Sequence, residues 1–136
     1  IPGDDVFYLD CRVLPRYPLS EVLEAMRKAA DDVERTFDVR IEISPVEQVQ
    51  APPPTPTDAP VVKALERAIK DIYGVSAEPV GIGGGTVAAP FRQVGFPVAV
   101  WSRIDLTAHQ PNESCFIENM LGDAKVYAHL FLQGSD

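Results

Sequence analysis

His109 and Glu113 lie four residues apart in the polar segment 102–113, directly after the apolar run Phe96–Trp101. Neutral imidazole is the commonest metal ligand among protein side chains, and a carboxylate at this spacing can orient it or balance its charge. Ligands of open α/β sheets usually bind in loops at the ends of strands. A lone histidine is more often an ordinary surface residue, and zinc needs three or four protein ligands. His109 is therefore either one ligand of a metal site or a histidine of a surface loop, and both interpretations stay open.

Nucleophilic chemistry has weaker support in the same part of the chain. Ser102, Asp105 and His109 have the residue types of a catalytic triad, but no Gly-x-Ser-x-Gly elbow exposes the serine. Cys115 is similarly unsupported as a nucleophile paired with His109. His129 falls in a predicted helix, away from its apolar stripe, and we interpret it as a solvated residue without function.

The glycine run from Gly81 to Gly85, followed by Thr86, is a second candidate for ligand binding. Glycine lets a backbone turn tightly and approach a ligand closely, and successive N–H groups can surround an anion. No lysine follows, as a Walker loop requires, and Thr86 stands where the last glycine of a dinucleotide-binding fingerprint would be. A tight turn between a strand and a helix explains the glycines equally well.

Asp10 and Arg12 lie on one face of residues 5–14, whose alternating pattern predicts a half-buried strand. They form either an ion pair or a site where Arg12 binds a substrate carboxylate through two N–H groups. A helix follows to Phe37, with Ser20 as its expected N-cap, and then a second strand over residues 39–43. This strand–helix–strand order predicts a βαβ unit with parallel strands and a right-handed crossover.

A proline-rich segment separates this unit from the rest, because prolines exclude both a helix interior and a central strand. We expect a first part over residues 1–49, a stiff linker over residues 50–57 and a second part over residues 58–136. In the second part, the pattern of apolar residues predicts helices over residues 60–73, 87–94 and 117–132, and strands over residues 77–80 and 96–101. The expected buried stripe of the last helix is Met120, Leu121, Ala124, Tyr127, Ala128 and Phe131.

The composition limits the function classes. The chain is 46% hydrophobic and 24% charged, with a net charge of −8, which disfavours nucleic acid as a partner. No apolar run approaches the length of a membrane helix. The first residues, from Ile1, resemble no signal peptide and lack an initiator Met, so we expect the chain to begin inside a longer protein or to have been processed. Cys11 and Cys115 indicate reduced thiols and a cytoplasmic location.

Taken together, these segments resemble a zinc-dependent peptidase and deacylase family. It includes acetylornithine deacetylase, succinyl-diaminopimelate desuccinylase, aminoacylase and carboxypeptidase G. The resemblance rests on the order of four motifs, which are Leu-Asp-Cys-Arg-Val-Leu-Pro at residues 9–15, Gly-Gly-Gly-Thr-Val-Ala-Ala at 83–89, Gly-Phe-Pro-Val-Ala-Val-Trp at 95–101 and Ala-His-Gln-Pro-Asn-Glu at 108–113. Each motif alone is modest, but together they cover nearly the whole chain.

The resemblance implies an α/β fold. Residues 1–49 would be the second half of a ferredoxin-like lid, or dimerisation, domain. The linker would join this partial β-α-β lid to residues 58–136, the C-terminal part of a zinc-aminopeptidase-like α/β catalytic domain. The family binds two Zn²⁺ ions, with Co²⁺ or Mn²⁺ as alternatives, and its other metal ligands would lie upstream of this chain.

The resemblance also implies roles for single residues. His109 matches the last metal ligand, and Glu113 the acidic residue that follows it and supports it. Gly84, Gly85 and Thr86 match a substrate-binding turn, and Arg12 a lid arginine that meets the substrate carboxylate in some members. The sequence departs from the common Gly-Gly-Thr-Asp-Ala-Arg pattern at Val87 and Ala89, with Arg92 three residues further on. This departure disfavours acetylornithine-like and desuccinylase-like substrates.

We therefore expect the C-terminal portion of a metal-dependent hydrolase that cleaves an amide bond of an N-acyl amino acid or small peptide. The portion alone should be inactive, since only His109 matches a ligand and no catalytic residue falls within the chain. Its expected partners are the substrate and a second copy bound through the lid region, without nucleic acid or membrane. The alternative is a non-catalytic dimerisation or anion-binding module built on the glycine turn.

Overall fold

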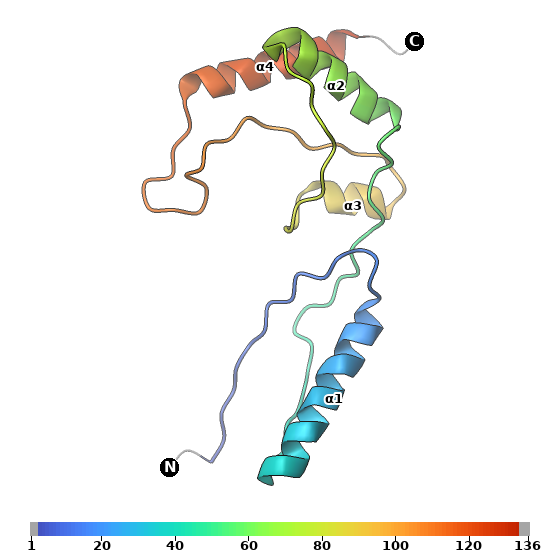
Figure 1. The fold of residues 1–136 in the computed structure, drawn as a ribbon, viewed down its shortest axis with the longest axis vertical. Coiled ribbons are helices and arrows are strands. Elements are labelled where there is room, and N and C mark those ends of the chain that lie inside the picture. Colours follow the sequence, from blue (N-terminus) through green and yellow to red (C-terminus); the bar gives the residue numbers. More distant parts are fainter. Residues whose placement is uncertain (1–2, 134–136) are drawn as a thin grey trace. The chain divides into compact units, whose positions relative to one another are not determined.

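The computed structural model describes residues 3–133 and contains four helices in that range (Figure 1). They are α1 (Leu19–Phe37), α2 (Pro60–Tyr73), α3 (Ala88–Gln93) and α4 (Ile117–Leu132). The expectation for the start of the chain at Ile1 falls outside the described residues. No helix in the described part is both long and apolar enough to cross a membrane.

None of the residues from 3 to 133 forms a β-strand. The segments that the sequence predicts as strands, residues 5–14, 39–43, 77–80 and 96–101, are extended but unpaired. A strand exists only through the hydrogen bonds of its neighbour. The α/β fold, with its partial ferredoxin-like lid, therefore remains a prediction.

The chain divides into two compact units. One contains Ile1–Pro53 together with Gly83–Gly85, and the other contains Pro54–Ile82 and Thr86–Asp136. The main division, between Pro53 and Pro54, falls inside the proline-rich segment over residues 50–57. The sequence did not predict that the glycine turn would group with the first unit.

In the first unit, α1 begins at Leu19, so its N-cap is Pro18, two residues before the expected N-cap Ser20. No side chain caps the helix from the N-cap position. Instead, the Leu19 N–H donates to Gln50 Oε1 at 2.9 Å, so a residue distant in sequence satisfies one of the free donors of the first turn. The expectation of Ser20 as N-cap was wrong because this acceptor is not local. The helix ends at Asp38, whose φ of 48° is left-handed.

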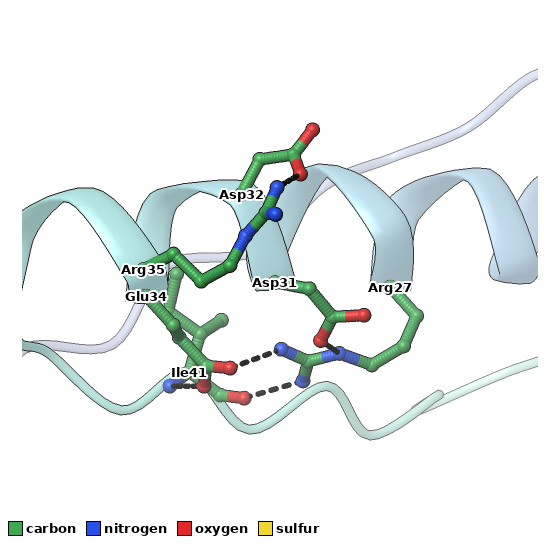
Figure 2. A network of polar contacts seen from close by, with 6 residues as sticks. All are labelled: Arg27, Asp31, Asp32, Glu34, Arg35 and Ile41. Carbon is green, nitrogen blue, oxygen red and sulfur yellow. Dashed lines mark hydrogen bonds and ion pairs between the residues drawn. The ribbon is translucent and has the colours of Figure 1, made fainter.

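Two side chains of α1 hold the extended segment after it (Figure 2). Glu34 accepts the Ile41 N–H at 2.5 Å, and Arg27 Nη1 donates to the Ile41 carbonyl at 2.6 Å. Arg27 also donates to Asp31 at 2.7 Å and to Glu34 at 2.8 Å. The hydrogen bond with Asp31 raises the pKa of the Arg27 guanidinium, and the negative charges of Asp31 and Glu34 act in the same direction. The side chains thus supply both backbone partners that a neighbouring strand would give Ile41.

In the second unit, α2 packs against α4 (Figure 1). As the sequence predicts, α2 has Pro60 in its first turn, and its C-cap Gly74 has a φ of 70° and donates to the Lys70 carbonyl at 2.8 Å. The core contains Leu65, Ala68 and Ile69 of α2 and Val126 of α4. Burial of these aliphatic side chains stabilises the packing of the two helices.

The prediction for the buried face of α4 was wrong, although its ends agree with the sequence analysis. The buried residues of this helix are Asn119, Gly122 and Val126. All members of the expected stripe are exposed in the described structure, namely Met120, Leu121, Ala124, Tyr127, Ala128 and Phe131. A polar residue and a glycine occupy the buried side because α4 makes close and polar contacts there, described below.

Side chains also hold the extended segment 96–101. The Thr55 hydroxyl donates to the Val98 carbonyl at 2.7 Å and accepts the Val98 N–H at 3.0 Å. The ring of Trp101 lies 5.6 Å from that of Tyr73 and 6.5 Å from that of Tyr127. The segment is only partly buried, because Phe96 and Val100 are exposed, and the expectation of burial on both faces was wrong.

Candidate functional site

His109 lies at the tip of a tightly turned loop between Trp101 and α4. Its φ is 60°, and that of Asn112 is 62°, both in the left-handed region that few residues other than glycine adopt. The Gln110 side chain donates to the Leu106 carbonyl at 2.8 Å. Backbone bonds from Gln110 to Thr107 and from Glu113 to Gln110 close successive turns. The loop therefore has a defined shape around the histidine.

Two further contacts join the sides of this loop. Thr107 Oγ1 donates to the Ser114 carbonyl at 2.6 Å and accepts the Ser114 N–H at 3.4 Å. Glu113 Oε2 accepts the His109 backbone N–H at 3.4 Å. The carboxylate of Glu113 thus contacts the backbone of His109, and the histidine itself is exposed.

A metal ion could use the His109 imidazole as one ligand. The imidazole is exposed and lies on a loop of defined shape. A side chain that binds a metal together with ligands from another part of a protein needs both properties. Among residues 3–133, no three His, Cys, Asp or Glu side chains are close enough to hold a metal together.

The triad interpretation has no support in the geometry. The Ser102 hydroxyl donates to Asp123 at 2.8 Å, and Asp105 accepts hydrogen bonds from Phe116 N at 3.3 Å and Asn119 Nδ2 at 3.1 Å. Both residues are engaged with α4 and its N-terminus. Asp105, one of the carboxylates near His109 in sequence, therefore serves the loop structure.

Arg12 forms the ion pair that is one of its two predicted roles. Its Nε and Nη2 donate to the Asp10 carboxylate at 3.1 Å, so the ion pair is present, with both side chains largely exposed. Its remaining nitrogen, Nη1, lies 3.8 Å from where a Cβ on Gly84 would be. The structure thus brings one guanidinium nitrogen of Arg12 near Gly84 of the glycine turn.

The glycine turn itself requires no left-handed backbone. Of the described glycines only Gly74 and Gly95 have positive φ, so Gly84 and Gly85 adopt conformations open to other residues. Thr86 Oγ1 accepts the N–H of Ala88, the first residue of α3, at 3.3 Å. The side chain of Thr86 has a structural partner in this state.

Several residues near these sites were missed by the sequence analysis. Asn119 and Asp123 bind the segment that leads to His109, and their spacing of four residues was the available signal. The buried Nε of Arg92 has no hydrogen-bond partner among the described residues. His129 is half-buried instead of solvated. Its Nε2 lies 3.1 Å from Asp71 of α2, and its Nδ1 lies 3.0 Å from the Gln133 side chain, which is a structural role.

One family model and two curated relatives match this chain. Residues 8–133 match the family model of peptidase family M20/M25/M40. The chain is 40% identical to an uncharacterized metallohydrolase of Methanocaldococcus jannaschii, in an alignment that covers 93% of this chain and 33% of the relative. It is 37% identical to an uncharacterized metallohydrolase of Methanococcus maripaludis, with coverage of 93% and 34%.

The chain spans about a third of the length of these curated relatives. No solved structure matches it significantly. The family match extends over nearly all of the sequence, from before Arg12 to the end of α4. This chain therefore belongs to peptidase family M20/M25/M40.

Proposed function

We propose that this chain is the C-terminal portion of a metal-dependent hydrolase that cleaves an amide bond in an N-acyl amino acid or a small peptide. The family membership and the metallohydrolase names of the two relatives support a metal-dependent hydrolase. The observation that carries the proposal is the exposed His109 on a loop fixed by side-chain and backbone hydrogen bonds. Such a loop lowers the entropy lost when its imidazole binds a metal.

The role of His109 is to donate one imidazole nitrogen to the metal site, whose other ligands lie outside this chain. Glu113, on the backbone N–H of His109, keeps the loop in the shape that presents the ring. A bound metal pair, with Zn²⁺ as the proposed ion and Co²⁺ or Mn²⁺ as alternatives, supplies a Lewis acid and a water of lowered pKa.

Arg12 and the glycine turn would bind the carboxylate of the substrate. The guanidinium group has one nitrogen near Gly84, 3.8 Å from where a Cβ would be, while Asp10 accepts from the other two. A substrate carboxylate would compete with Asp10 for Arg12, or bind to Nη1 alone and to the N–H groups of Gly84 and Gly85. Thr86, the next residue of the chain, would offer its hydroxyl.

The proposal includes three properties of the whole protein. Its architecture would be α/β, and the extended segments 5–14 and 39–43 would pair with strands of a ferredoxin-like lid. It would form a homodimer through this lid region. The portion described here would be inactive alone, because one imidazole in water holds zinc weakly and no general base is fixed beside it.

The test is a hydrolysis assay with a protein of the relatives' length and with the present chain. Both are loaded with Zn²⁺ and offered N-acyl amino acids and dipeptides, with esters and phosphate esters as other reaction classes. We expect amide turnover from the long protein, loss of turnover with a chelator, and none from the short chain. Turnover by the short chain above its His109→Ala variant contradicts the inactivity, and no amide turnover by the long protein contradicts the reaction class.

A further inference from the structure

One face of α4 carries three polar residues at intervals of four, namely Asn119, Asp123 and Tyr127. Each of them contacts the segment 101–105, which leads from Trp101 into the loop of His109. We define these three residues and their partners on the segment as the polar ladder. All of its members belong to the second unit.

The contacts follow one another in order along both elements. The Tyr127 hydroxyl donates to the Trp101 carbonyl. The Asp123 carboxylate accepts the Ser102 hydroxyl at 2.8 Å and the Arg103 N–H at 3.2 Å. Asn119 Nδ2 donates to Asp105 at 3.1 Å. The segment therefore runs antiparallel to α4, with its contacts spaced about two residues apart.

The two repeats match in length. Four residues of an α-helix rise by about 6 Å, and two residues of an extended chain advance by about 6.6 Å. Side chains four residues apart on α4 can therefore reach successive positions of the segment without bending it. Since an extended chain leaves its backbone polar groups free, the helix replaces part of the hydrogen bonding that a strand partner would provide.

The ladder also fixes the far end of the loop. Asp105, held by Asn119, accepts the N–H of Phe116, the residue immediately before α4. The segments before and after the loop are thereby joined to each other and to the same helix. Asn119 is only 7% exposed, which makes its polar contact costly to lose.

From this geometry we infer that Asn119, Asp123 and Tyr127 are positioning residues for His109. They set the place and direction of the loop that presents the imidazole to the metal, without touching the metal themselves. The inference rests on the proposed role of His109 as a ligand. It adds that polar contacts along α4 fix the position of this imidazole.

The sharpest test exchanges the donor and the acceptor in one contact. Asn119→Asp places two carboxylates face to face and removes the donor. Adding Asp105→Asn restores a pair, because the new amide at position 105 can donate to the carboxylate at position 119 while its oxygen accepts the Phe116 N–H. Tyr127→Phe removes a single hydrogen bond and keeps the ring beside Trp101. Lys125→Ala, exposed on the same helix, is the control.

Two readouts are made on the full-length protein with Zn²⁺ as the probe. Hydrogen exchange is followed at the Arg103, His109 and Phe116 amides, and Zn²⁺ affinity by titration calorimetry. We expect Asn119→Asp and Tyr127→Phe to speed this exchange and to weaken Zn²⁺ binding, by about tenfold for Asn119→Asp, the order found for residues that orient metal ligands. The double exchange should recover most of the affinity, and Lys125→Ala should match the unmodified protein.

The outcomes separate this inference from the proposed function. Unchanged loop exchange in Asn119→Asp overturns the ladder. Faster loop exchange with unchanged Zn²⁺ affinity overturns the positioning role, provided that His109→Ala weakens the affinity. If His109→Ala itself leaves Zn²⁺ binding unchanged, the proposed ligand is wrong, and the inference falls with it. Failure of the double exchange to recover affinity also contradicts the inference, since a paired contact would then have no effect on the ligand.

Discussion

Tyr73 of α2 and Gly122 of α4 are so close that a side chain on Gly122 would collide with the tyrosine ring. A Cβ added to Gly122 would lie 1.9 Å from the Tyr73 hydroxyl oxygen and 2.7 Å from Cζ. The same hydroxyl lies 3.5 Å from Asp123, a member of the polar ladder. The glycine thus lets the two helices approach, and the tyrosine contacts two members of the ladder, Trp101 and Asp123.

Gly122→Ala should destabilise the chain despite the better helix propensity of alanine. Overpacking costs about 1–3 kcal/mol, against a gain of about 1 kcal/mol from replacing glycine in a helix. Tyr73 must move, and Trp101, the only tryptophan of the chain, reports this by a change in its emission. In a Tyr73→Ala background the same substitution should be stabilising. A gain in stability in both backgrounds, measured by urea unfolding, would show that Tyr73 does not restrict this position.

Glu34→Ala and Arg27→Met should release the segment after α1. Glu34→Ala removes the acceptor of the Ile41 N–H, and Arg27→Met removes the group that orients this acceptor. Hydrogen exchange at the Ile41 amide should therefore become faster in both variants. Arg35→Ala is the matched control, since Arg35 pairs only with Asp32 in the network of Figure 2. Equal exchange at Ile41 in all three variants would contradict the role of the network.

The upward pKa shift of Arg27 defines the pH range of this contact. A group whose pKa is raised on folding stabilises the fold below its unfolded pKa, and loses that effect only above its folded pKa. For Arg27 this loss falls in strong alkali. Arginine therefore stays charged between neutral and moderately alkaline pH. Over this range, the protection of the Ile41 amide against hydrogen exchange should stay constant once it is corrected for the intrinsic exchange rate.

Thr55→Val should destabilise the second unit because it removes a donor and an acceptor for Val98 at nearly constant volume. Each lost hydrogen bond contributes about 0.5–1.5 kcal/mol, and the unsatisfied backbone groups add to the cost. Thr57→Val, two residues further on and exposed, is the control and should be close to neutral. Equal unfolding free energies for the two variants would remove Thr55 as an anchor of residues 96–101.

Arg12→Met should weaken the binding of substrates that carry a carboxylate. In the full-length protein we expect KM for an N-acyl amino acid to rise by at least about tenfold, as for a lost charged hydrogen bond. The corresponding N-acyl amino acid amide should be affected much less. Arg16→Met serves as the control, because Arg16 stacks on Tyr17. A uniform effect on both substrates would assign Arg12 a structural role with Asp10.

The ends of α2 and α4 were predictable from sequence because their signals are local. The start of α2 at Pro60 and its end at Gly74 follow from the chemistry of those two residues, and α4 was predicted with its observed ends. Local signals do not give the environment of a helix. The apolar stripe of α4 is exposed, while Asn119 and Gly122 are buried, because Asp105 and Tyr73 approach that side.

The candidate site was only partly predictable for the same reason. The sequence indicated His109 and Glu113, and the structure adds the contact between Glu113 and the His109 backbone. The contacts that join the loop to α4 involve residues far apart in sequence, such as Ser102 with Asp123. The expected strands depend on partners that no local pattern specifies.

His109 is proposed as a metal ligand, and the number of zinc ions bound per chain tests this role most directly. The full-length protein and its His109→Ala and His129→Ala variants are loaded with Zn²⁺, dialysed, and analysed for bound zinc by mass spectrometry. The account predicts that His109→Ala loses one zinc ion per chain, whereas His129→Ala, whose histidine pairs with Asp71, keeps the full content. Equal zinc content in the His109→Ala variant and the unmodified protein would contradict the account.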